Sequence, residues 1–102
     1  MAERNHGGVR EGELHRPALE VMATRPNGAI STSDLIDELA EIFRPSGRDA
    51  RIIPGRNDTY FSQKVRNLIC HRNAPSSFIA QGYAEYTGDG LRNTNAGRRL
   101  IA

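Results

Sequence analysis

Hydrophobic residues recur three or four positions apart in three stretches of the chain, which is the spacing of side chains along one face of a helix. This pattern predicts helices over roughly residues 13–24, 33–44 and 57–72. Pro17 fits the first helix because proline is tolerated in a first turn. The predicted core-facing stripes comprise Leu14, Ala18, Val21 and Met22 in the first helix, Leu35, Ile36, Leu39, Ile42 and Phe43 in the second, and Phe61, Val65, Leu68 and Ile69 in the third.

Residues that favour helix starts precede the second and third stripes. Ser31, Thr32 or Ser33 can cap the second helix, because a short side-chain oxygen accepts a hydrogen bond from the first free backbone N–H groups. By the same reasoning, Asn57 or Asp58 is predicted to cap the third helix.

Short strands are predicted on both sides of this helical region. Ala29–Ile30 reads as a single edge strand, and residues 83–86 alternate as a strand. Residues 87–90, Thr-Gly-Asp-Gly, form a tight turn that lets residues 91–94 return as the partner strand. Asn95 is predicted to cap a short closing helix. The order of helix, strand, helix, helix and hairpin predicts an α+β fold of the winged helix-turn-helix class, mainly helical with a small antiparallel β-hairpin wing.

Length and composition are consistent with one domain. The chain has 102 residues, enough for a modest core without disulfides or metals. Residues 1–12 are predicted to be a flexible lead and residues 13–102 the domain. Cys70 is the one cysteine, so no disulfide can form within the chain and a reducing setting is expected. No signal-peptide core or membrane-spanning run is evident, so we expect a cytoplasmic location and no membrane contact.

Charge is unevenly distributed along the chain, although the net charge is only +2. Residues 1–43 carry four basic against eight acidic side chains, a net charge of −4. Residues 44–73 carry seven basic against two acidic side chains, a net charge of +5. Thirteen of the fourteen basic residues are arginine, which suits forked contacts with phosphate and guanine. This polarity favours a face turned toward a polyanion.

The third predicted helix carries a polar and cationic stripe opposite its hydrophobic one. Glutamine and asparagine side chains pair with the edge of adenine, and arginine pairs with guanine. This stripe therefore predicts a helix that lies in a DNA major groove, although an amphipathic helix whose polar face meets only water has the same pattern. The residues predicted to lie nearest the bases are Thr59, Tyr60, Gln63, Arg66 and Asn67.

Other basic residues are predicted to neutralise DNA phosphates. Four arginines lie in the long connection of residues 44–57, which is either a contact loop or a mobile solvated one. Arg72 lies near the hydrophobic stripe and can instead be paired inside. The wing, with Asp89 at its tip, is expected over the backbone or in the minor groove. The predicted backbone contacts are Arg48, Arg51, Arg56, Lys64, Arg72 and Arg92.

Residues that could support catalysis are scattered. A metal-dependent nuclease needs clustered acids with a lysine, but Lys64 is the one lysine and lies in the predicted reading helix. Cys70 and His71 are adjacent on that helix, so their side chains point about 100° apart. The three histidines lack ligand spacing, and no glycine-rich loop fits between a strand and a helix. We therefore expect no enzymatic activity, no metal and no cofactor.

Four segments of the chain form a recognisable combination: ISTSDLIDELAEIF, the PSG and PGR loop, FSQKVRNLICHR and GYAEYTGDGLRNTNAGRRLI. Together they resemble the N-terminal winged-helix domain of Mrr-type restriction proteins and, more loosely, winged helices attached to modification-sensing restriction nucleases. The resemblance covers residues 13–101. The sequence departs from the family pattern at Asn67 and Leu68, where Trp-Ala is usual, and at HRNAPSS, which lengthens the passage to the hairpin.

The resemblance implies a double-stranded DNA-binding specificity module joined to a separate nuclease domain in the full-length chain. If the resemblance extends to the sensing of methylated bases, it implies that Tyr60 or another aromatic residue stacks on a flipped or methylated base. The alternative is that Tyr60 covers the end of the core. Two other functions fit the same pattern. A small free-standing transcription regulator would need a dimer, for which the first helix is the natural surface, and a winged helix can also dock on a protein. We expect a monomer or a weak dimer.

Overall fold

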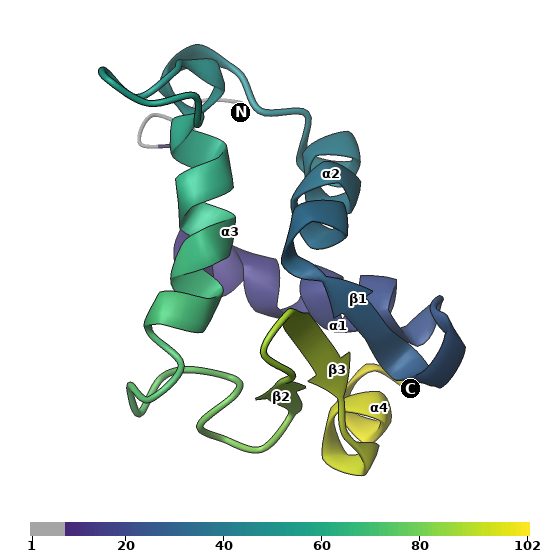
Figure 1. Ribbon diagram of the computed structural model, residues 1–102. Coiled ribbons are helices and arrows are strands. Elements are labelled where there is room, and N and C mark those ends of the chain that lie inside the picture. Colours follow the sequence, from purple (N-terminus) through teal and green to yellow (C-terminus); the bar gives the residue numbers. More distant parts are fainter. Residues whose placement is uncertain (1–7) are drawn as a thin grey trace.

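A computed structural model of the protein describes residues 8–102 (Figure 1). Within these residues the chain forms a compact α+β domain, so the predicted α+β class is confirmed. The helices are α1 (His15–Ala23), α2 (Thr32–Phe43), α3 (Tyr60–Cys70) and α4 (Asn95–Ile101), with 3-10 turns η2 (Glu11–Leu14), η3 (Pro26–Gly28) and η4 (Gly47–Ala50). The strands are β1 (Ala29–Ser31), β2 (Ala84–Tyr86) and β3 (Gly90–Asn93).

The strands form one antiparallel sheet in the order β1-β3-β2. Leu91 of β3 is the central residue, since it is opposite Ile30 of β1 and Tyr86 of β2. β1 is therefore an edge strand, as predicted. Gly90 has to be glycine, because a Cβ there would lie 1.9 Å from the Ile30 carbonyl oxygen.

α2, α3 and α4 each begin at a side-chain cap, whereas α1 follows η2 directly and has none. Ser31 caps α2 by accepting a hydrogen bond from the Asp34 N–H. The predicted caps of the other two helices are wrong by one or two residues. Thr59, rather than Asn57 or Asp58, caps α3, and Thr94, rather than Asn95, caps α4.

The hydrophobic core lies between α1, α2 and α3, with β3 packed against α1 and α2. In Figure 1, α3 stands beside α2 and α1 crosses behind both. The predicted stripes supply most of the core, and its largest fully buried side chains include Leu19, Met22, Leu35, Leu39, Phe61 and Leu68. The prediction that Ile42 faces the core is wrong. Ile42 is 55% exposed, because only the Phe43 side of the last turn of α2 faces α3.

The N-terminal segment of the described chain contacts the domain. Residues 1–7 of the predicted lead lie outside the described residues. In residues 8–12, the Val9 N–H donates to the Asp49 carboxylate at 2.8 Å, and Glu11 begins η2. None of the helices within residues 8–102 combines the length and the apolar character needed to cross a lipid bilayer.

Candidate nucleic-acid interface

α3 turns its hydrophobic stripe inward and leaves its polar stripe at the surface. Phe61, Val65 and Leu68 are at most 1% exposed, which confirms the predicted orientation. The opposite stripe is partly exposed along its length and comprises Tyr60, Gln63, Arg66 and Asn67. In Figure 1, α3 stands at the edge of the domain, with no other helix or strand on the side away from α2.

The polar stripe is joined to the preceding loop by a chain of hydrogen bonds. Arg56 Nη2 donates to Gln63 Oε1 at 2.7 Å, and Gln63 Nε2 donates to Asn67 Oδ1 at 2.9 Å. Asp58 accepts from both Arg56 and Arg66. Sequence reasoning missed this network, because spacing along a helix does not reveal which residues of the preceding loop fold back onto it.

Two of the predicted base-reading residues, at the start of α3, also make contacts within the domain. The Thr59 hydroxyl accepts from the Ser62 N–H at 3.0 Å and donates to Ser62 Oγ at 3.0 Å, so it serves as the helix cap. The Tyr60 ring lies under the guanidinium of Arg48, with Cζ 4.8 Å from the ring centroid. Such a cation–π contact orients the arginine while leaving its N–H groups accessible.

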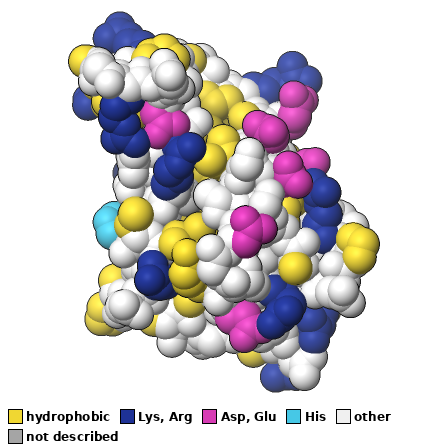
Figure 2. All heavy atoms as spheres, viewed as in Figure 1, with side chains coloured by type: hydrophobic (Ala, Val, Ile, Leu, Met, Phe, Trp, Pro, Cys, Tyr) yellow, Lys and Arg dark blue, Asp and Glu magenta, His cyan; other side chains and the backbone are white. Residues whose placement is uncertain are grey.

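Backbone hydrogen bonds within the connection between α2 and α3 hold this segment folded back on itself. It contains η4, an isolated bridge between Ile52 and Thr59, and a hydrogen bond of 2.7 Å from the Ile53 N–H to the Asp58 carbonyl. Figure 2 shows Lys and Arg side chains gathered over this connection and the start of α3, whereas Asp and Glu side chains gather over α2. Arg48, Arg51 and Arg56 are exposed.

Lys64 faces the N-terminal segment. Its Nζ lies 2.6 Å from Asp49 Oδ1 and donates to the Val9 carbonyl at 2.7 Å. Asp49 is only 2% exposed, and its other oxygen accepts from the Val9 N–H. Sequence reasoning missed this buried pair, because an acidic residue inside an arginine-rich loop has the pattern of a solvated residue.

The two remaining predicted phosphate contacts are paired within the domain. Arg72 donates from Nη1 to the Ile69 carbonyl at 2.8 Å, and its Cζ lies 4.5 Å from the centre of the Tyr86 ring. This placement matches the alternative in which Arg72 is paired inside. Arg92 lies 2.8 Å from Glu85 in an exposed ion pair across β2 and β3.

The hairpin is short, and its tip is fixed to the domain. The Asp89 carbonyl accepts from the Thr32 N–H at 3.0 Å and from the Thr32 hydroxyl at 3.2 Å. The tip therefore rests on the first turn of α2.

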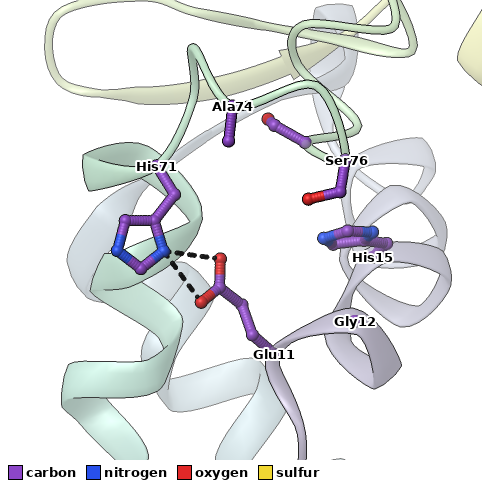
Figure 3. Close-up of a pocket in the computed structure, with 7 residues that line it drawn as sticks. Glu11, Gly12, His15, His71, Ala74 and Ser76 are labelled. Atoms are coloured by element: carbon purple, nitrogen blue, oxygen red, sulfur yellow. Dashed lines mark hydrogen bonds and ion pairs between the residues drawn. The ribbon is translucent and has the colours of Figure 1, made fainter.

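A pocket of about 400 Å³ lies beside the C-terminal end of α3 (Figure 3). Its lining comprises Glu11, Gly12, His15, His71, Ala74, Ser76 and Ser77. His71 Nδ1 lies 3.0 Å from Glu11 Oε1, and the His15 ring stacks on Phe78 at a centroid distance of 4.6 Å. Burial lowers the pKa of His15, and the nearby Glu11 carboxylate opposes that shift. Within residues 8–102, no group of three or more His, Cys, Asp or Glu residues is arranged to hold a metal ion.

Comparisons with known proteins identify no relative. No family model, curated protein or solved structure matches the chain. The resemblance to Mrr-type winged helices therefore remains a prediction based on the sequence segments quoted above.

The most developed surface feature is thus the outer side of α3 with the arginine-bearing connection. It presents carboxamide, phenol and guanidinium groups, which can donate and accept hydrogen bonds at the surface.

Proposed function

We propose that residues 13–102 form a winged-helix module that binds double-stranded DNA and reads the major groove with α3. The observation that carries this proposal is the partly exposed polar stripe of α3, which comprises Tyr60, Gln63, Arg66 and Asn67 and lies opposite the buried hydrophobic stripe. A helix held in this way by a rigid core can enter a groove without unfolding any part of the domain.

The arrangement of the elements supports the winged-helix assignment. The order α1, β1, α2, α3, β2, β3 and the sheet order β1-β3-β2 are those expected when a hairpin pairs with a strand from between the first two helices. The short β2–β3 turn is the proposed wing. Because its tip is fixed to α2, we assign the wing a supporting role, with Arg92 as its phosphate contact.

From the hydrogen bonds we infer different roles for the residues of α3 and the preceding connection. Gln63, Asn67 and Arg66 are proposed to contact base edges, with Tyr60 beside them. The exposed Arg48, Arg51 and Arg56 are proposed to contact phosphates. Thr59 caps the helix, and Lys64 and Arg72 hold neighbouring segments, so these three residues are assigned structural roles instead.

The family resemblance extends the proposal to biological context. We propose that the module gives specificity to a nuclease domain of a restriction or defence protein and senses methylated bases. A free-standing regulator would differ by forming a stable dimer, so sedimentation of the chain distinguishes the two: a monomer fits the module.

Fluorescence anisotropy with labelled short duplexes tests the proposal. Unmodified, hemimethylated and fully methylated duplexes are compared between about 50 and about 200 mM salt. Binding to duplex is expected, with a logarithmic salt slope of about 3.6, since the four arginines proposed to contact phosphates would each contribute about 0.9. Absence of binding at the lower salt concentration would refute DNA binding, and equal affinity for all duplexes would remove the modified-base proposal.

Substitutions in the same assay test which residues read bases. Gln63→Ala or Asn67→Ala is expected to reduce discrimination between sequences by about 1–3 kcal/mol. Arg51→Ala is expected to weaken binding to every duplex alike and to lower the salt slope by about 1. Arg16→Ala, which removes an exposed arginine from α1, is the matched control. The reverse pattern would place the reading face elsewhere.

A further inference from the structure

Asp58 lies between two arginines at the start of α3. Its Oδ2 accepts a hydrogen bond of 2.7 Å from Arg56 Nη2, and its Oδ1 accepts from Arg66 Nη1. The Asp58 side chain is 16% exposed, whereas those of Arg56 and Arg66 are 49% and 42% exposed. One carboxylate thus bridges two guanidinium groups that remain half open to solvent.

The backbone fixes the Asp58 carboxylate relative to the helix. The Asp58 carbonyl accepts from the Ile53 N–H at 2.7 Å, and the next residue, Thr59, pairs with Ile52 and caps α3. With the chain held on both sides, the carboxylate is a stationary acceptor rather than a swinging side chain.

The bridge leaves donors available on both arginines. A guanidinium has five N–H donors in a planar fork, and Asp58 engages one nitrogen of each arginine. An arginine tethered in this way has lost most of its rotamer freedom, so it reaches a guanine edge at a smaller entropic cost.

The influence of Asp58 extends along the helix through Arg56. Arg56 Nη2 also donates to Gln63 Oε1, which orients the Gln63 amide so that its Nε2 donates to Asn67. The positions of the two carboxamides thus depend on an arginine that Asp58 holds in place.

The same carboxylate opposes indiscriminate binding. It places a negative charge beside Arg56 and Arg66, which weakens the attraction of both arginines for any phosphate, and sequence-independent affinity depends on how fully phosphates are neutralised. Removing the charge should therefore strengthen binding to DNA in general while loosening the side chains that read bases.

Given the proposed DNA-binding function, we propose that Asp58 is a positioning residue for sequence specificity. It holds Arg66 directly, and Gln63 through Arg56, in orientations suited to base edges, and it weakens binding to sequences that offer only phosphates. A residue needed only for folding would lower affinity and specificity together, whereas this role predicts opposite changes.

The experiment uses the whole chain and a labelled pool of duplexes with a randomised centre. Anisotropy gives affinity for the pool, and sequencing of the bound fraction gives discrimination. For Asp58→Asn, pool affinity should rise about threefold at about 50 mM salt, and the salt slope should steepen by about one to two. Discrimination at the position read by Arg66 should fall by about tenfold.

Two further variants separate charge, geometry and folding. Asp58→Glu keeps the charge but moves the carboxylate by one methylene, so pool affinity should stay at the wild-type level while discrimination falls. Asp37→Asn, an exposed acid of α2, changes net charge equally and should leave discrimination unchanged. Thermal unfolding identifies any variant that fails to fold. If Asp58→Asn does not fold, Asp58→Glu is the variant that tests the role of Asp58.

The outcomes for Asp58 and for DNA binding are distinguishable. If the wild-type chain binds no duplex in the pool, the proposed function fails. If the wild type binds with sequence preference but Asp58→Asn and Asp58→Glu retain that preference, or if Asp58→Asn binds the pool more weakly, the role of Asp58 is refuted while DNA binding stands.

Discussion

At the scale of single residues, the basic side chains of residues 44–73 differ in what they can do. Arg48 and Arg56 are exposed, whereas Lys64 is paired with a nearly buried carboxylate. The sequence predicted a phosphate contact for each of these three residues. The difference arises from tertiary contacts with Val9 and Asp49, which are 55 and 15 residues away from Lys64 along the chain.

Lys64→Met should destabilise the domain by about 3 kcal/mol, because it leaves the Asp49 carboxylate buried without its cationic partner. Chemical denaturation measures the change. The double variant Lys64→Met with Asp49→Asn should recover part of the loss, since it removes the uncompensated charge. A loss below about 0.5 kcal/mol for the single variant would contradict the contribution assigned to this pair.

At the scale of elements, the start of α3 combines two tasks on adjacent residues. Thr59 caps the N-terminus of α3, and the Asp58 carboxylate accepts hydrogen bonds from Arg56 and Arg66. From residue type alone, Asp58 could equally have been the N-cap residue of α3, since aspartate is also a good cap. Thr59 is the residue with the extended backbone next to the helix, and that conformation decides which oxygen reaches the free N–H.

Thr59→Ala should lower stability by about 1 kcal/mol, the usual contribution of a helix cap. Asn57→Ala, a change two residues earlier at an exposed position, should have no measurable effect on the melting temperature. Equal effects from the two substitutions would show that the cap is shared or lies elsewhere.

The sequence predicted the elements that depend on periodicity. Helical spacing located α2 and α3 to within a few residues, and the Thr-Gly-Asp-Gly turn located the hairpin, since these signals are local. The exposed Ile42 was misassigned, because periodicity cannot tell how far along a helix its neighbour extends. The arginine bridge at Asp58 and the buried Asp49 were also missed, because both depend on how one loop folds back on the domain.

At the scale of the whole molecule, His15 couples stability to pH. Burial holds the pKa of His15 below the ordinary value of about 6.5, so the unfolded chain binds more protons as the pH falls below that value. Stability should therefore be highest above about pH 6.5 and should decrease as pH falls below it.

Urea denaturation between about pH 5.5 and about pH 7.5 measures this dependence. His15→Phe retains a ring that can stack on Phe78 and removes the titrating group, so the slope of stability against pH should become shallower. An unchanged slope in that variant would assign the dependence to other groups.

The bond between Val9 and Asp49 has a practical consequence for handling the protein. The first described residues lie against η4, beside the arginines proposed to meet DNA, while the C-terminal end lies by β1 and α4 (Figure 1). A purification tag or sensor-chip linkage close to Val9 would thus crowd the surface proposed to meet DNA. Attachment after Ala102 leaves that surface unobstructed.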